Sequence, residues 1–155
     1  MALNTKKVID QLNRILECEL AVVVRHTHYS MMIFGYNRIP IVSWFREEAA
    51  ESLQHAQQAG EMVTRLGGHP SLGIGPLLET HHHDIGQILR ETLQAEHNAL
   101  ALYNQLLKLV AGKSVALEEY ARDLITQEEA HIDEIDKMLR ESGEPSISKE
   151  GRDLD

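Results

Sequence analysis

The sequence predicts an all-α protein, a four-helix bundle built from two antiparallel hairpins that a long crossover joins. Proline and glycine are sparse and clustered, and four long segments without internal proline lie between the clusters. No segment shows the alternation of apolar and polar residues that is typical of half-buried strands. Two of the three connections are short, whereas the middle one, GGHPSLGIGPLLETH, can cross the length of a bundle.

The first hairpin is predicted from the capping signals at the ends of its two helices. Its first helix is expected to run from Thr5, as the N-cap, to about Phe34. Its second helix is expected to run from Pro40 or Ser43 to Leu66, because the glycine pair that follows is a common helix stop. The short connection between them makes these helices antiparallel neighbours.

The second hairpin is predicted in the same way. Its first helix should begin within residues 80–84 and end before Gly112. Its second helix should begin after Ser114, as the N-cap, and end before Gly143. Together the two hairpins account for nearly the whole chain.

Length and composition indicate a single soluble domain. The chain has 155 residues, and we expect residues 1–143 to form the bundle and residues 144–155 a polar, flexible tail. The formal net charge of −9 argues against binding to nucleic acid or to an anionic membrane. The single cysteine excludes a disulfide within the chain, and no stretch resembles a signal peptide or a membrane span of ~18 apolar residues. We therefore expect a cytoplasmic protein.

Ionisable residues interrupt the core-facing stripes of the predicted helices, which are traced in steps of three and four residues. Glu19, Glu96 and Glu128 each lie near the middle of an otherwise apolar stripe. His55 lies on the stripe of the second helix, and His131 follows Glu128 by three residues. A buried carboxylate is costly without a compensating charge. One such acid could be a satisfied polar group, but three at mid-length indicate a shared cation site.

The two hairpins repeat one pattern, because their polar core positions recur after 76 or 77 residues. The pairs related in this way are Glu19 with Glu96, Ser52 with Glu128, and His55 with His131. Two Glu-x-x-His turns plus a glutamate from each remaining helix bind two metal ions in bundles of this kind, with carboxylates able to bridge. Glutamate and histidine together suit Fe, Mn or Zn better than Ca or Mg.

The first copy of the Glu-x-x-His turn lacks its glutamate, because Ser52 stands three residues before His55. Three replacements are geometrically possible. Glu51 lies four residues before His55 and shares its face, and Glu48 lies one turn below Ser52 on that face. Alternatively, Ser52 itself or a water molecule fills the gap. We favour Glu48 or Glu51 lying near the site, without assigning either as a ligand.

The chain resembles bacterioferritin and the wider ferritin-like di-iron group, most strongly in LNRILECELA, GGHPSL and EEAHIDEID. The resemblance implies a ferritin-like four-helix bundle, and family members form cages that oxidise Fe(II) with O2 or peroxide and store ferric mineral. It also implies a set of metal ligands at the matching positions. These are Glu19 and Glu96 as terminal ligands, Glu128 as a bridging ligand, and His55 and His131.

Several positions depart from the family pattern. The family's bridging glutamate falls on Ser52, and its haem-ligating methionine falls on Leu53, which argues against axial haem ligation. A tyrosine usually beside the di-iron site falls on His26, which lies on the stripe of Glu19 and is a candidate extra ligand. The short fifth helix of the family has no clear counterpart in EPSISKEGRDLD. Separately, the tract HHHD at residues 81–84 could hold a transition metal at the surface.

Two functional hypotheses follow. In the first, a homo-oligomer, at least a dimer and in the extreme a cage, oxidises Fe(II) at a di-metal carboxylate site for iron storage or detoxification. In the second, the chain is a metal-binding or structural subunit with an incomplete, weakly active centre that holds one ion such as Zn(II) or Fe. Ser52 and the missing fifth helix support the second hypothesis.

Overall fold

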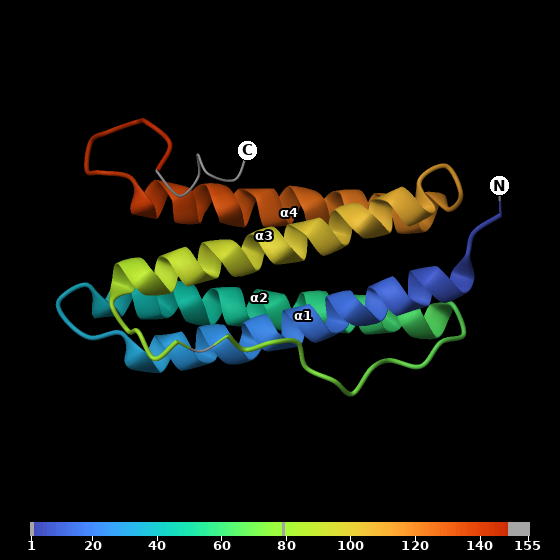
Figure 1. Cartoon of the computed structure of the whole chain (residues 1–155), viewed down its shortest axis with the longest axis horizontal. Helices are drawn as coiled ribbons and strands as arrows, with labels where there is room; N and C mark the ends of the chain where they lie inside the picture. The colour runs from blue at the N-terminus through green and yellow to red at the C-terminus, as the bar shows by residue number, and fades with distance from the viewer. Residues whose placement is uncertain (1, 79, 149–155) are drawn as a thin grey trace.

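Four helices form the fold in the computed structural model, which describes residues 2–78 and 80–148. They are α1 (Thr5–Met32), α2 (Arg38–Arg65), α3 (Ile85–Val110) and α4 (Val115–Leu139). α1 and α2 form one antiparallel hairpin and α3 and α4 another, and the green crossover returns along the bundle so that α3 runs parallel to α2 (Figure 1). The described residues contain no strand, so the predicted all-α bundle with a long crossover is confirmed.

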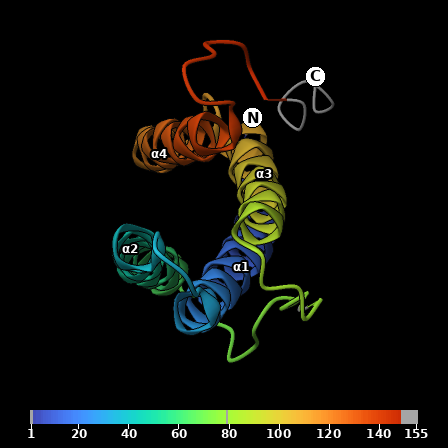
Figure 2. The same cartoon turned by 90° about the vertical axis from the view of Figure 1, so that its left-hand side faces the viewer.

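The helices pack as two hairpins joined through α1 and α3. α1 packs against α2 and α3, and α3 packs against α4, whereas the backbones of α2 and α4 approach each other less closely. An end-on view places α1 and α3 next to each other, with α2 and α4 on the same side of them (Figure 2). No helix in the described part of the chain is both long and apolar enough to cross a membrane.

Helix boundaries differ from the predicted ones where a local signal was misassigned. Asn4, not Thr5, caps α1, because its side chain accepts a hydrogen bond from the backbone N–H of Lys7 at 3.1 Å. α2 begins before both predicted starts, Pro40 and Ser43. Proline is tolerated in a first turn because the N–H groups there have no helical acceptor.

The other helix ends follow the predicted signals closely. Ser114 caps α4 as expected, and Asp84 caps α3 through the backbone N–H of Gln87. Gly67 and Gly112, with φ of +78° and +70°, follow α2 and α3 at the predicted positions. α1 and α4 end a few residues earlier than expected, at Met32 and Leu139.

The core consists of two apolar clusters separated by a polar layer. The cluster at the end of the bundle that holds the start of α1 is built around Leu12, Tyr103 and Leu124. The cluster at the other end is built around Tyr29 and Phe45. The polar layer between them contains Glu19, His26, Ser52, His55, Thr92, Glu96 and Glu128, all buried. The hydrophobic clusters therefore hold the helices together on both sides of the ionisable groups.

Side chains of α1 fasten the crossover to the bundle. Asn13 donates to the carbonyl of His69 and accepts from the N–H of Ser71 at 3.1 and 2.9 Å. The backbone carbonyl of Glu17 accepts from the N–H of Gly75 at 2.9 Å. A Cβ at Gly75 would lie 3.1 Å from that carbonyl oxygen, so this approach favours glycine.

The beginning of the predicted tail folds back onto the end of α4. Ser148 is buried, and its N–H and hydroxyl both donate to Oδ1 of Asp136. Arg140 donates to Oδ2 of Asp136 at 2.8 Å and to the carbonyl of Pro145 at 2.9 Å. Residues 149–155, the rest of the predicted tail, lie outside the described residues.

Replacing Asp136 by Asn is expected to lower the free energy of unfolding by roughly 1 kcal/mol at pH 7, because an amide accepts these hydrogen bonds less strongly. Burial opposes ionisation of Asp136, but hydrogen bonds from Ser148 and Arg140 outweigh it and lower the pKa of the carboxyl. A lowered folded-state pKa gives stabilisation that is complete above the unfolded-state pKa of about 3.9 and is lost as the pH falls through the folded value.

Urea denaturation at pH 7 and at about pH 2 checks this expectation, because the difference from wild type should shrink in acid. Asp133→Asn changes an exposed carboxylate on the same helix and serves as the control. An equal loss of stability at both pH values would contradict the assignment.

Candidate metal centre

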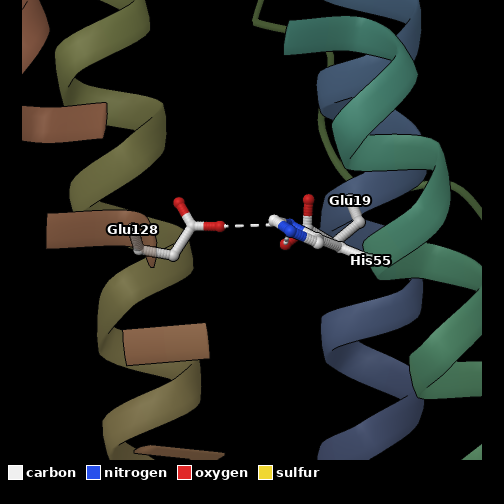
Figure 3. A group of neighbouring side chains, drawn as sticks. All are labelled: Glu19, His55 and Glu128. Carbon is white, nitrogen blue, oxygen red and sulfur yellow. Dashed lines mark ion pairs between the residues drawn. The ribbon is translucent and has the colours of Figure 1, made fainter. Parts of the chain in front are cut away.

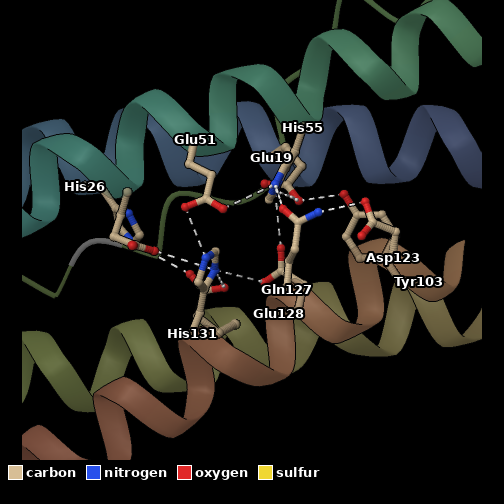
Figure 4. Close-up of polar contacts among 11 residues, drawn as sticks. Glu19, His26, Glu51, His55, Tyr103, Asp123, Gln127, Glu128 and His131 are labelled. Atoms are coloured by element: carbon tan, nitrogen blue, oxygen red, sulfur yellow. Dashed lines mark hydrogen bonds and ion pairs between the residues drawn. The ribbon is translucent and has the colours of Figure 1, made fainter. Parts of the chain in front are cut away.

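The polar layer brings together the five residues for which the sequence predicted metal ligation. Glu19 comes from α1, His55 from α2, and Glu128 and His131 from α4 (Figure 4), and Glu96 comes from α3. The three glutamates and His55 are each at most 3% exposed, and His131 is partly buried. They meet because each lies on the inward stripe of its helix at the same depth in the bundle.

A first group of potential ligands consists of Glu19, His55 and Glu128. The Nδ1 atom of His55 lies 3.5 Å from Oε1 of Glu19 and 3.5 Å from Oε1 of Glu128 (Figure 3). One ligand atom from each residue lies within 4.8 Å of the others. Ligand atoms bound at about 2.1 Å from one ion lie at most about 4.2 Å apart, so small side-chain movements would place all three around it.

A second group consists of Glu96, Glu128 and His131. The Nδ1 atom of His131 lies 3.7 Å from Oε2 of Glu96 and 3.8 Å from Oε2 of Glu128. Glu128 therefore faces the first group with one carboxylate oxygen and the second group with the other. This is the arrangement that a carboxylate needs to bridge two ions.

Glu48 and Glu51 both lie beside the second group, on α2, where Ser52 takes the place of the glutamate of a Glu-x-x-His turn. Oε2 of Glu48 lies 3.5 Å from Nδ1 of His131, the same ring nitrogen that faces the second group. Glu51 instead contacts the outer ring nitrogen, Nε2, of both histidines. Its carboxylate lies 3.2 Å from Nε2 of His131 and 3.8 Å from Nε2 of His55. Ser52 is buried but has no carboxylate to offer. One ligand atom each from Glu48, Glu51 and His131 also lies within 4.8 Å of the others, with the Glu48 oxygen beside the inner nitrogen of His131.

Residues outside the predicted set orient two of these side chains. The Tyr103 hydroxyl donates to Oε1 of Glu19 at 2.8 Å. The amide oxygen of Gln127 lies 2.9 Å from Nε2 of His55, and the amide nitrogen of Gln127 donates to Asp123 at 2.9 Å. When Nε2 of His55 carries the proton, this contact leaves Nδ1 with its lone pair facing the centre.

Sequence reasoning did not find these orienting residues. Tyr103 lies on the inward stripe of α3 seven residues after Glu96, where the helical period by itself indicates only a core-facing aromatic side chain. Gln127 and Asp123 form an ordinary i,i+4 pair near the surface. Only the proximity of Tyr103 to α1 and of Gln127 to α2 reveals their partners.

Protons compensate part of the negative charge in the centre. Burial by itself disfavours the imidazolium of His55, but Glu128 and Glu19 outweigh it and raise the pKa of His55 to about 10. Burial likewise opposes ionisation of His131, and Glu128 and Glu96 raise its pKa to about 11. Both imidazoles are therefore protonated at neutral pH, and a metal ion must displace these protons to bind.

The carboxyl groups respond to burial and to one another. Burial, with the neighbouring Glu128, raises the pKa of Glu96 to about 7. Burial also raises the pKa of Glu48 to about 7, against the opposing effect of His131. Burial opposes ionisation of Glu128 as well, but its contacts with Glu96 and the two histidines lower its pKa. Glu128 is thus the acid that holds its charge in the middle of the cluster.

The donor set fits a transition-metal ion. Nδ1 of His55, Oε2 of Glu128 and Nδ1 of His131 are buried and make no hydrogen bond. Each of these three atoms belongs to a residue of the first or the second group. Bound cations would therefore give all three atoms a partner. Carboxylate oxygens with imidazole nitrogens are ligands that Fe, Mn and Zn accept readily.

His26 lies beside the centre without joining either group. It is 1% exposed, its Nε2 atom lies 3.9 Å from Oε1 of Glu96, and its ring packs edge-on against Phe45. Neither ring nitrogen makes a hydrogen bond. Burial lowers the pKa of His26 to about 4, so the ring is neutral. Whether His26 is an additional metal ligand beside Glu96 therefore stays a prediction.

The remaining residues singled out in the sequence lie away from the centre. Leu53 is exposed, at 42%, on the outer side of α2 and has no atom that could ligate haem iron. His81 and His82 are exposed, and the His83 ring lies 5.7 Å from the ring of His28, at the end of the crossover. The tract therefore contributes no ligand to the polar layer.

Comparison with known proteins agrees with this architecture. Residues 9–142 match the ferritin-like domain family. The chain is 30% identical to the bacterioferritin of Rhodobacter capsulatus over 139 residues, which cover 86% of this chain and 83% of that protein. It is 31% identical to the bacterioferritin of Brucella melitensis over 142 residues, with the same coverage.

Solved structures share the fold. A ferritin-like diiron-carboxylate protein of Bacillus anthracis superimposes with a TM-score of 0.84 at 23% identity, covering 90% of this chain and all of that one. A dodecameric thioferritin of Bacteroides fragilis superimposes with a TM-score of 0.83 at 23% identity, covering 88% and 86%. Rhodobacter capsulatus bacterioferritin, solved with a metal-free dinuclear site and heme iron, gives 0.77 at 26% identity, covering 88% and 85%.

Replacing Tyr103 by Phe is expected to weaken metal binding by about 10- to 100-fold, because Glu19 loses the hydrogen bond that orients it. Anaerobic titration with Fe(II), followed by calorimetry, measures the change. Tyr120→Phe is the matched control, since the Tyr120 ring packs against Tyr103 but no hydrogen bond joins the Tyr120 hydroxyl to Glu19. Equal affinities of the two variants would show that Tyr103 does not position the ligand.

Proposed function

Since this chain belongs to the ferritin-like family and is related to the bacterioferritins, we propose that it oxidises Fe(II) at the buried carboxylate–histidine centre for iron storage or detoxification. The observation that carries the proposal is Glu128, which turns one oxygen toward each of two potential metal positions. Fe(II) is the substrate, and O2 or peroxide is the oxidant.

Each residue has a definite part in this proposal. Glu19 and His55 hold one Fe(II), Glu96 and His131 hold the other, and Glu128 bridges them. Two Fe(II) ions lose one electron each, and O2, accepting both electrons with two protons, becomes hydrogen peroxide. The hard carboxylate oxygens favour the ferric product over the ferrous substrate, and binding of Fe(II) releases the protons of His55 and His131.

Glu48 completes the second position in place of the glutamate that the family has at Ser52. It reaches the inner nitrogen of His131 from one turn earlier on α2. Glu51 lies farther out, with 36% of its side chain exposed, and contacts the outer nitrogens of both histidines. It is placed to pass Fe(II) from solvent to the centre, and the net charge of −9 attracts the cation.

The proposal extends to assembly and compartment. We expect a homo-oligomer, at least a dimer and potentially a cage, and the dodecameric thioferritin of Bacteroides fragilis supports this by similarity of fold. Exposed apolar side chains such as Met31 and Leu53 suit a subunit interface. A cytoplasmic location is consistent with the single free cysteine, Cys18. Haem has no ligand at Leu53 and no part in the proposal.

A second candidate function rests on Ser52. If Glu48 does not ligate, the second position lacks a carboxylate, and the chain is a metal-binding or structural subunit with a weakly active centre. Such a subunit would hold one ion, Zn(II) or Fe, at the first group. The two functions differ in the number of ions bound and in turnover.

Glu128→Ala is expected to reduce Fe(II) oxidation by roughly 100-fold or more, because both metal positions lose a shared ligand. The rate is followed by ferric absorbance after Fe(II) is mixed with aerated buffer, and circular dichroism verifies the fold. Glu129→Ala removes the adjacent, exposed carboxylate and should leave the rate unchanged. Wild-type oxidation in Glu128→Ala would remove the centre from the mechanism.

Elemental analysis after anaerobic Fe(II) loading and desalting is expected to give two irons per chain for the wild type and one for Glu48→Gln. Ser52→Glu should add little activity to a centre that Glu48 already completes. A wild type that binds one iron or fewer, together with a large gain of oxidation in Ser52→Glu, would instead establish the second candidate function.

A further inference from the structure

A pocket of about 360 Å³ lies between α1, α3 and the crossover, outside the polar layer. Its walls are largely apolar. They include Val22 and Ala95 from the helices and Pro76 and Leu78 from the crossover. The size and composition suit a small ligand with an apolar body.

One end of this pocket carries a buried cation without a counter-ion. Arg25 lines the pocket and is 7% exposed. Its guanidinium forms no ion pair with any carboxylate in residues 2–78 and 80–148. Nη2 donates to the Tyr29 hydroxyl at 3.2 Å and to the carbonyl of Glu91 at 3.4 Å, while Nε is buried and makes no hydrogen bond. The Glu91 carboxylate is engaged instead by the Tyr29 hydroxyl, at 2.6 Å.

A buried charge without a counter-ion is costly, so the arrangement around Arg25 is suited to an anion that enters the pocket. A single guanidinium balances one negative charge, which favours a carboxylate over a phosphate. Glu17 and Arg14 line the pocket two to three turns away along α1, about 12 Å or more from Arg25, and of these charged side chains only Arg25 is buried. An anionic head group is therefore attracted to the Arg25 end and an apolar tail to the middle.

We propose that this pocket binds a medium-chain carboxylate, with its head group paired to Arg25 and its alkyl chain against Val22, Ala95 and Leu78. The proposal does not depend on metal binding, because the pocket shares no residue with the two ligand groups. The crossover forms one wall of the pocket, and the Gly75 hydrogen bond to Glu17 fixes that wall in place.

Calorimetric titration of the full chain with octanoate and with 1-octanol tests the proposal. Octanoate is expected to bind with a Kd on the order of 1 mM or tighter, and octanol about tenfold more weakly. Equal binding of the two, or no octanoate binding at about ten times that concentration, would overturn the proposal. This comparison uses the wild type and so does not depend on the folding of any variant.

Two variants locate the head group, and a third blocks the tail. Arg25→Met should lose about tenfold or more in octanoate affinity. Arg14→Met changes an exposed arginine that lines the same pocket and should change affinity by less than about threefold. Ala101→Phe fills the pocket from an exposed position and should abolish binding. Wild-type affinity in Arg25→Met or in Ala101→Phe would contradict the proposal.

Discussion

Three carboxylates buried at the middle of a four-helix bundle are the constraint on which the rest of this structure depends. Glu19, Glu96 and Glu128 are buried away from solvent, and cations within the bundle must compensate their negative charge. Protonated His55 and His131 meet part of it, and bound metal ions are suited to meet the rest. The two apolar clusters supply the packing that keeps these groups together despite their mutual repulsion.

Ser52, which stands where the second hairpin has Glu128, makes the two halves of the centre unequal. The first group has the carboxylates of Glu19 and Glu128 around His55. The second has Glu96 and Glu128, and Glu48 faces the same nitrogen of His131. A carboxylate one turn away on α2 can face the same inner space because residues three to four apart share a helix face. The two potential metal positions are therefore surrounded by carboxylates from different positions on α2 and α4.

Opposite charges are buried on the two sides of α1. On its inner side, Glu19 faces a space where acids outnumber cations and where metal ions fit. On the side toward the crossover, Arg25 is buried at a pocket and forms no ion pair among the described residues. The same physical rule, that a desolvated charge needs a partner, leads to a cation on one side and an anion on the other. Each ligand would stabilise the folded state by binding to it alone.

Local sequence determined the four helices, most of their caps and the inward direction of the ionisable residues. Helical periodicity is a property of neighbouring residues, so Glu19, Glu96 and Glu128 could be placed on core-facing stripes without any knowledge of packing. Ser114 and the glycines after α2 and α3 likewise act within one turn. The start of α2 was misplaced because Pro40 is permitted inside a first turn as well as before it.

Only the tertiary structure decided which side chains meet. Glu48 and Glu51 share a helix face, and the separation of α2 from α4 determines that Glu48 reaches the inner nitrogen of His131 and Glu51 the outer one. The contact of Tyr103 with Glu19 and the burial of Arg25 beneath the crossover depend in the same way on distances between elements remote in sequence. Such distances follow from packing of whole helices, which no local pattern of residues encodes.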